Sequence, residues 1–124
     1  MFGSIPNEIV NLSHLSHLLL SHNNISGTIP SKIHKLENLV HLSLDYNSLQ
    51  GTIPFSIGKC EMLQILDVGH NKLDGSIPIE LYNARELILL SLFSNNLEGE
   101  ISSEIGQLGK IAMCKLIQPE HIFS

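Results

Sequence analysis

Apolar and polar positions along this 124-residue chain recur with a period of 24. One apolar column consists of Leu15, Leu39, Leu63, Leu87 and Ile111, and another of Leu20, Leu44, Val68, Leu92 and Leu116. Within each unit, alternation such as Leu18-x-Leu20 has period two, as a short strand with one buried face requires. One strand per unit, always in the same direction, predicts coils stacked in a parallel sheet with strands about 4.8 Å apart.

Glycine, proline and asparagine follow the same period. Gly recurs at Gly3, Gly27, Gly51, Gly75 and Gly99, Pro at Pro6, Pro30, Pro54 and Pro78, and Asn at Asn23, Asn47, Asn71 and Asn95. Gly permits a turn or a close backbone approach, and Pro fixes the following bend. An inward Asn amide offers donors and an acceptor to turn backbone that lacks other partners, so we predict a structural Asn ladder.

Each unit reads L-x-x-L-x-x-L-x-L-x-x-N-x-L-x-G-x-I-P-x-x-I and resembles the plant-type leucine-rich repeat of receptor-like kinases and receptor-like proteins. The resemblance implies an α/β solenoid of 24-residue coils, with a parallel β-sheet on the concave face and short 3-10 or irregular segments on the convex side. Repeats are expected over residues 1–118, four nearly complete and partial at both ends, and residues 119–124 are expected to form an irregular tail.

The outward strand positions form the candidate ligand-binding face. They are His17, Leu19, Ser21, His22, His41, Ser43, Asp45, Tyr46, Ile65, Asp67, Gly69, His70, Leu89, Ser91, Phe93 and Ser94. Aromatic and apolar groups supply contact area, and His, Asp and Ser supply directional hydrogen bonds. Protonation of the histidines near about pH 6 would make this mildly acidic face cationic, so we predict pH-dependent ligand affinity. Paired imidazoles can hold a metal ion, but solvated histidines are far commoner, and no metal is expected.

Composition and motifs narrow the functional classes. The net charge is -5 and Lys and Arg are scattered singly, so no basic stripe for nucleic acid is present. We find no Gly-rich phosphate loop, metal-ligand spacing or G-x-S-x-G motif, and therefore expect no enzyme, no catalytic residue and no cofactor. No apolar run approaches the roughly 20 residues of a membrane span, and residues 1–6 do not resemble a secretory signal.

The two cysteines and the ends of the chain depart from the family's pattern. Members of the family close both ends of the stack with paired Cys, whereas Cys60 and Cys114 stand in Leu columns two coils apart. That separation exceeds disulfide reach, so both are expected to be core residues. Ser102 replaces a Pro, and Pro119 stands where a further Asn is due. We therefore expect a fragment, a truncated product or part of a longer receptor.

The resemblance also implies a function: a non-catalytic ligand- or protein-binding segment of a plant receptor-like kinase or receptor-like protein, acting in signal perception. Its partner would be a peptide, a glycan, or a protein ligand or co-receptor, and the parent would lie at the extracellular face of the plasma membrane or in the cell wall. Two alternatives are a soluble inhibitor similar to the polygalacturonase-inhibiting proteins and the sensor part of a parent protein kinase.

Two further features bear on these expectations. Some receptors of this family hold a peptide's terminal carboxylate with an Arg-x-Arg pair, but the nearest cation in the inner columns is Lys115. Asn11 and Asn24 head Asn-x-Ser sequons and are candidate N-glycosylation sites if the protein enters the secretory route.

Overall fold

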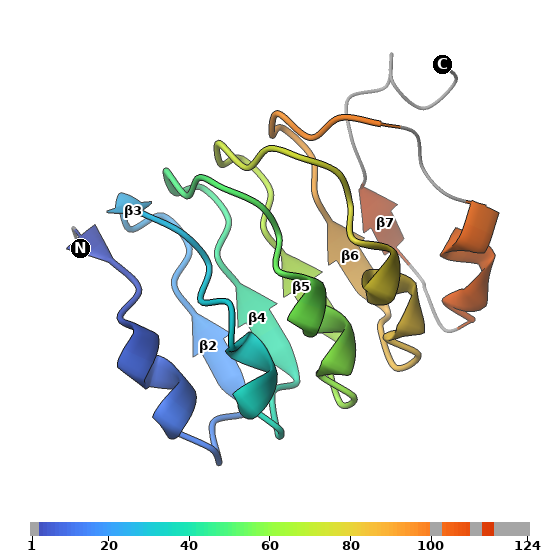
Figure 1. The fold of residues 1–124 in the computed structure, drawn as a ribbon, viewed down its shortest axis with the longest axis horizontal. Coiled ribbons are helices and arrows are strands. Elements are labelled where there is room, and N and C mark those ends of the chain that lie inside the picture. Colours follow the sequence, from blue (N-terminus) through green and yellow to red (C-terminus); the bar gives the residue numbers. More distant parts are fainter. Residues whose placement is uncertain (1–2, 100–102, 110–112, 116–124) are drawn as a thin grey trace.

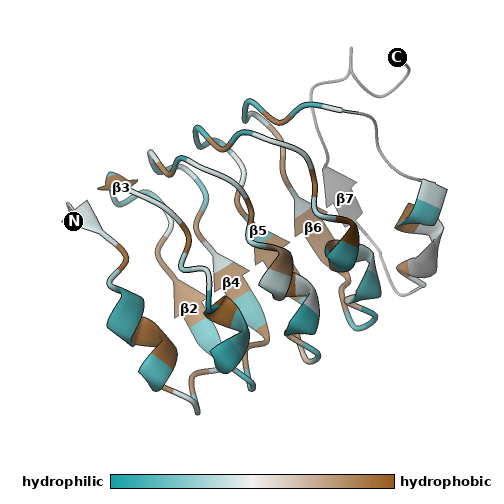
Figure 2. Ribbon diagram, viewed as in Figure 1, coloured by the Kyte–Doolittle hydropathy of each residue, from teal (hydrophilic) through white to brown (hydrophobic). Residues whose placement is uncertain are grey.

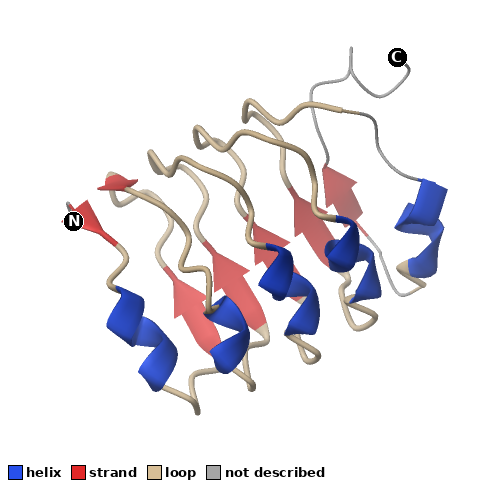
Figure 3. Ribbon diagram, in the orientation of Figure 1, coloured by secondary structure: helices blue, strands red, loops and turns tan. Residues whose placement is uncertain are grey.

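The computed structural model describes residues 3–99, 103–109 and 113–115. Its coils lie side by side in a row that runs from the N-terminal to the C-terminal end of the chain (Figure 1). The strands line one side of the row, and short helices line the other (Figure 3). This arrangement confirms the predicted solenoid, with its sheet on one face and its 3-10 segments on the opposite face. Among the described residues, no helix has the length and apolar character needed to cross a membrane.

The main sheet contains five parallel strands in the order β2-β4-β5-β6-β7. Their bounds are β2 (His17–Leu19), β4 (His41–Ser43), β5 (Ile65–Asp67), β6 (Leu89–Ser91) and β7 (Met113–Lys115). The register follows the 24-residue period, so that His17 is paired with His41, His41 with Ile65, and Ile65 with Leu89. The repeat length read from the sequence therefore equals the register of the sheet. A second, two-stranded parallel sheet joins β1 (Gly3–Ser4) to β3 (Ile25–Ser26).

Among the described residues, five 3-10 helices, labelled η, occupy the convex side. They are η1 (Asn7–Asn11), η2 (Ile33–Lys35), η3 (Phe55–Lys59), η4 (Ile79–Asn83) and η5 (Ser103–Gln107). Pro54 and Pro78 immediately precede η3 and η4, with φ of -65° and -64°. Because the pyrrolidine ring fixes φ near these values, each Pro sets the direction in which the chain enters its helix.

The apolar columns fill the space between the strands and the helices. Leu39, Leu63 and Leu87 are 0% exposed, and residues of the strand centres such as Leu42 are equally buried. Apolar and hydrophilic residues are mixed along the strands and helices, and short apolar segments also occur in the connecting loops (Figure 2). Cys60 is buried in this core as a free thiol. Cys114 lies in β7, and its side chain is outside the described part of the structure.

The asparagine column joins neighbouring coils through turn backbone. Asn47 Oδ1 accepts hydrogen bonds from the backbone N–H groups of Asn23, at 2.9 Å, and Ile25, at 3.0 Å. Its Nδ2 donates to the carbonyls of Leu20 and Leu44, both at 2.9 Å. Asn71 and Asn95 continue the ladder one and two coils further on, each accepting from one backbone N–H, of Leu49 or Leu73, and donating to carbonyl oxygens of neighbouring turns. Each of these amides therefore supplies partners that the turns themselves cannot provide.

Two kinds of glycine position determine the spacing of the coils. Gly51 has φ of +78°, a conformation that L side chains rarely adopt, and Gly27 and Gly75 in the same column are similar. Gly58 is required for a different reason, because an added Cβ would lie 2.1 Å from the carbonyl oxygen of Glu80. The backbones of η3 and η4 therefore touch at a position that only glycine can occupy.

The expected boundary between the repeats and the tail, at residues 118 and 119, falls outside the described residues.

Candidate functional site

The candidate site is the concave face of the main sheet, where residues beside the buried strand centres point away from the core. His17, Leu19, His22 and Tyr46 are exposed, and most other candidate positions are half-buried. Gly69 and Ser91 are buried, and for these two positions the expected exposure is wrong. A Cβ added to Gly69 would lie 3.2 Å from both Asp67 Oδ1 and Ser91 Oγ. The short Ser91 side chain is thus enclosed by its neighbours and does not reach the open surface.

A ladder of four rings runs along one margin of this face. The centroids of His22 and Tyr46 lie 4.3 Å apart, and those of Tyr46 and His70 lie 4.1 Å apart, with 10° between the planes in both pairs. Phe93 extends the row by meeting His70 edge-on at 6.1 Å. The sequence places the first three rings in one column, whereas Phe93 belongs to the adjoining column. We refer to these four residues as the ring ladder.

The backbone explains why the rings are stacked. His22, Tyr46 and His70 have φ of 58°, 57° and 54°, so the chain turns identically at this position in each coil. Their backbone N–H groups donate to carbonyls of the next coil, including Tyr46 N–H to Gly69 O at 3.0 Å and His70 N–H to Phe93 O at 2.8 Å. Identical turns repeated at the rung spacing of about 4.8 Å bring planar side chains into face-to-face contact.

A second pair of imidazoles lies at the beginning of the strands. The rings of His17 and His41 are 5.8 Å apart and tilted by 57°. His17 Nδ1 lies 2.8 Å from Ser16 Oγ, and His41 Nε2 lies 2.7 Å from Ser43 Oγ. Burial lowers the pKa of His41, as does the charge of His17 to a smaller degree, while two aspartates oppose that decrease. The protonated form of His41 is therefore disfavoured relative to a histidine in water.

Those aspartates, Asp45 and Asp67, lie between the two rows of imidazoles. Asp45 Oδ1 accepts a hydrogen bond of 2.6 Å from Ser21 Oγ, and Asp67 Oδ1 accepts one of 3.0 Å from the backbone N–H of Gly69. Each carboxylate is thus oriented through one oxygen. Within the part of the chain that the structure describes, no group of three or more His, Cys, Asp or Glu side chains could hold a metal ion.

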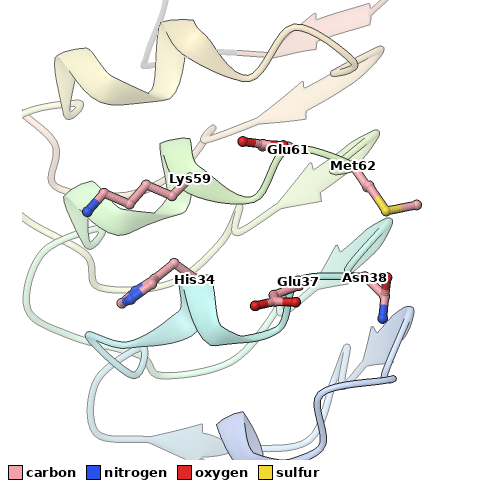
Figure 4. A pocket seen from close by; sticks show the side chains of 6 residues that line it. All are labelled: His34, Glu37, Asn38, Lys59, Glu61 and Met62. Carbon is pink, nitrogen blue, oxygen red and sulfur yellow. The ribbon is translucent and has the colours of Figure 1, made fainter.

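Two of the hollows in the described part of the chain lie away from the concave face and were not predicted from the sequence. One, of about 450 Å³, is lined by His34, Glu37, Asn38, Lys59, Glu61 and Met62. Glu37 and Glu61 occupy the same place on adjacent coils, with Lys59 nearby on the second coil (Figure 4). The other, of about 790 Å³, includes the exposed Phe55. Members of the repeated columns, including Gly51, Ile53 and Pro54, line part of the larger hollow, and the 62% exposure of Phe55 is a signal that the sequence alone does not carry.

A stack of parallel coils, each with one strand and one 3-10 helix and joined by an asparagine ladder, defines a solenoid repeat protein. A family model described as Leucine Rich Repeat matches residues 14–36, 38–60, 62–84 and 86–108. The chain belongs to the leucine-rich repeat family.

Solved plant structures are similar over nearly the whole chain. The Arabidopsis receptor kinase HAESA, in complex with the peptide hormone IDA and the co-receptor SERK1, is 39% identical with a TM-score of 0.90, covering 94% of this chain and 20% of HAESA. The ectodomain of GASSHO1/SCHENGEN3 from Arabidopsis thaliana, in complex with CASPARIAN STRIP INTEGRITY FACTOR 2, is 36% identical with a TM-score of 0.89, covering 93% of this chain and 14% of that one.

A plant ice-binding protein has a similar solenoid fold, although its name describes a different function. It is 35% identical to this chain with a TM-score of 0.82, and the alignment covers 86% of this chain and 35% of that protein. The chain spans at most about a third of the length of these three structures. Curated proteins compared with this sequence gave no match. Because the same scaffold serves different functions, the function must be argued from the side chains on its surface.

Proposed function

We propose that this chain is a ligand-binding segment of a plant receptor ectodomain, and that it binds an extended peptide or a protein surface along its concave face. The observation that carries this proposal is the concave face itself. Exposed or half-buried rings, apolar side chains and hydrogen-bonding groups lie there in register on four consecutive coils. The Leu and Asn columns, in contrast, are buried or hydrogen-bonded within the fold.

The chemistry of the face is that of recognition. Leu19 and Tyr46 are 56% and 47% exposed and offer apolar contact area. His17, His41 and Ser43 offer donors and acceptors along the same strands. Interfaces of this kind gain affinity from such aromatic and apolar anchors, and specificity from the polar groups around them. Two similar receptor ectodomains, those of HAESA and GASSHO1/SCHENGEN3, were solved with a bound partner, which supports a peptide or protein ligand.

The matched repeats and receptor ectodomains support a binding role for this chain and not a catalytic one. We further propose that the parent protein is a membrane receptor, with these repeats at the extracellular face of the plasma membrane and a serine/threonine kinase domain on the other side. The receptor-kinase relatives support this proposal. Sequencing the complete transcript tests it, since a reading frame that lacks both a membrane helix and kinase motifs would contradict it.

A peptide-display experiment tests the binding proposal. A library of random 12-residue peptides would be selected on the chain and then re-tested on a concave variant, Leu19→Ser/Tyr46→Leu. The matched control, Phe55→Ser/Ile79→Ser, removes two exposed apolar side chains, 62% and 53% exposed, from the convex helices. We expect selected peptides to lose binding to the concave variant and to keep binding to the control. Peptides that bind both variants as well as they bind the original chain would contradict the proposal.

A further inference from the structure

The larger hollow, of about 790 Å³, lies along the Gly-x-Ile-Pro segments that lead into η2, η3 and η4. These segments follow one another along one edge of the solenoid (Figure 1). Each of three consecutive coils contributes the hydroxyl residue that follows its Gly, namely Thr28, Thr52 and Ser76. The hollow therefore spans three coils at equivalent positions, and we refer to it as the flank hollow.

The three hydroxyl residues are exposed, and their hydroxyls are unpaired. Among the described residues, no hydrogen bond is found for the hydroxyl of Thr28, Thr52 or Ser76. The threonine methyl groups, in contrast, are packed against the next coil. A Cβ added to Gly51 would lie 3.1 Å from Thr28 Cγ2, and one added to Gly75 would lie 3.0 Å from Thr52 Cγ2. A packed methyl group restricts χ1 of a threonine, so each hydroxyl keeps one direction.

Backbone hydrogen bonds fix the spacing of this row of hydroxyls. Gln50 N–H donates to Gly27 O at 2.8 Å. One coil further on, Asp74 N–H donates to Gly51 O at 2.9 Å. Coils joined in this way are about 4.8 Å apart, whereas an extended peptide advances by about 3.3 Å per residue and falls out of step with them. The repeat of a β-1,4-linked pyranose chain is close to one rung, so successive rings can each meet one coil.

The remaining lining is apolar and uncharged. Phe55, the first residue of η3, is 62% exposed and forms part of the wall, together with buried Ile53 and Pro54. Within the described part of the chain, no charged residue lines the flank hollow. A charged ligand would lose water there without gaining a partner, so charge complementarity favours an uncharged one. Apolar walls with a few placed polar groups are typical of small-molecule sites.

We propose that the flank hollow binds a neutral, extended glycan chain. The C–H face of one pyranose ring would pack on Phe55, and sugar hydroxyls would form hydrogen bonds with Thr28, Thr52 and Ser76. A hydroxyl both donates and accepts, so each of these side chains can pair with a sugar hydroxyl in either sense. The flank hollow lies away from the concave face. One chain can therefore hold a glycan and a peptide ligand at once, and this proposal does not rest on the proposed function.

Isothermal titration calorimetry of the full chain tests the proposal with three β-1,4-linked hexasaccharides, of glucose, mannose and xylose. We expect at least one of them to bind with one-to-one stoichiometry. Its affinity should change less than about twofold between low and high salt, because no ion pair is formed. If none of the three binds, or if an anionic galacturonic acid hexasaccharide binds more tightly, the proposal is wrong. An uncharged Gly-Thr-Pro peptide that binds the flank hollow in place of the glycans would also overturn it.

A ring variant tests the apolar wall. Phe55→Ser should lower the affinity for the bound hexasaccharide at least about tenfold. The matched control, Leu12→Ser, removes a side chain that is 54% exposed and lies outside the flank hollow, and it should bind as the original chain does. Equal affinities in these two variants would overturn the proposal. The concave variant Leu19→Ser/Tyr46→Leu should keep glycan binding, which distinguishes failure of this proposal from failure of the proposed function.

A hydroxyl variant tests the polar row. Thr28→Val/Thr52→Val/Ser76→Ala keeps the packed methyl groups but removes all three hydroxyls, so we expect a loss in affinity of at least about tenfold. The control Ser13→Ala/Ser103→Ala removes two exposed hydroxyls elsewhere and should bind normally. Circular dichroism and unfolding temperatures would show that the variants keep the fold. Unchanged affinity in the folded threefold variant would overturn the proposal.

Discussion

The phenol ring of Tyr46 lies 4.1 Å from the imidazole ring of His70, centroid to centroid, with 10° between their planes. The two residues are 24 positions apart in the sequence and adopt nearly the same φ, 57° and 54°. Equal backbone conformations on successive coils thus place their rings face to face. The relationship links the repeat period to the surface that we propose to bind a ligand.

The contribution of this stacking to stability can be measured at Tyr46, which contacts a ring on each side. Tyr46→Phe keeps both contacts and should leave the free energy of unfolding nearly unchanged. Tyr46→Leu keeps an apolar side chain at the same φ but removes both ring contacts, so we expect a loss of about 1 to 3 kcal/mol. Urea unfolding of both variants checks this, and equal stability would show that the stack contributes little.

The pKa of His41 gives a second prediction. Burial lowers it from the ordinary 6.5, followed by the charge of His17, against the opposing effects of Asp45 and Asp67. The unfolded chain then takes up this proton at a higher pH than the folded chain. The contribution of His41 to the free energy of unfolding is therefore complete above pH 6.5. It decreases as the pH falls from 6.5 toward the lowered pKa that His41 has in the folded chain.

Proton NMR titration of the histidine rings measures this pKa directly. We expect the midpoint of His41 to lie below 6.5 and to rise in a His17→Gln variant, because one repulsive charge has been removed. An Asp67→Asn variant should move the midpoint further down, since an attractive charge has been lost. A His41 midpoint that does not respond to either substitution would contradict the assigned causes.

The repeat period allowed the strand register, the buried columns and the members of the concave face to be predicted from sequence. Because side chains alternate along a strand, Leu18-x-Leu20 fixes which side faces the core. The period also placed His22, Tyr46 and His70 in one column. The fold was therefore predictable almost completely, and the membership of the candidate face largely so.

Contacts that depend on backbone conformation could not be predicted in this way. The parallel stacking of the rings requires positive φ at non-glycine residues, which no spacing indicates. Phe93 joins the ring ladder from another column because the fourth coil carries Ser94 at the ladder position. The burial of Ser91 depends on its neighbours on the third coil, Asp67 and Gly69. Such details follow from three-dimensional packing and not from the period.

Asn47 should be among the most sensitive positions of the chain. Its amide accepts two backbone hydrogen bonds and donates to Leu20 and Leu44. Asn47→Ala removes these partners from the N–H groups of Asn23 and Ile25 and from the carbonyl of Leu20, whereas Leu44 O keeps Asn71 Nδ2 at 3.0 Å, so we expect a loss of at least about 2 kcal/mol in the free energy of unfolding. The control Asn96→Ala changes an exposed residue and should lie within about 0.5 kcal/mol of the original chain. Similar losses for both variants in urea unfolding would contradict the role of the ladder.

Gly58 and Gly106 form a second matched pair, since they occupy the same column two coils apart. A Cβ at Gly58 would lie 2.1 Å from Glu80 O, whereas a Cβ at Gly106 would meet nothing within 4 Å. Gly58→Ala should force η3 and η4 apart and lower the free energy of unfolding by about 2 kcal/mol or more, as overpacking generally does. Gly106→Ala should be neutral or slightly stabilising. Thermal unfolding of the two variants tests this prediction. An unchanged unfolding temperature in Gly58→Ala would show that the two helices can move apart at little cost.

Cys60 should be unreactive while the chain is folded. Its side chain is buried, its thiol lies 3.8 Å from the carbonyl oxygen of Ile33, and burial raises its pKa from 9.0 to about 11. Thiolate, the reactive form, is therefore scarce at about pH 8, and a reagent cannot reach the sulfur. In a Cys114→Ser variant, a thiol reagent should label Cys60 in urea but not in buffer.

The raised pKa of Cys60 also predicts that the stability of the folded chain decreases at alkaline pH. The folded chain holds the thiol proton of Cys60 more tightly than the unfolded chain does. The contribution of this proton to the free energy of unfolding is therefore complete below pH 9 and is lost as the pH rises from 9 toward about 11. Replacing Cys60 by Leu, the residue of its column at Leu12 and Leu36, should remove this part of the alkaline decline. Unfolding curves at pH 8 and pH 10 for the two chains measure the difference. Identical declines, or rapid labelling of Cys60 in buffer, would show that the thiol is more accessible than its buried position implies.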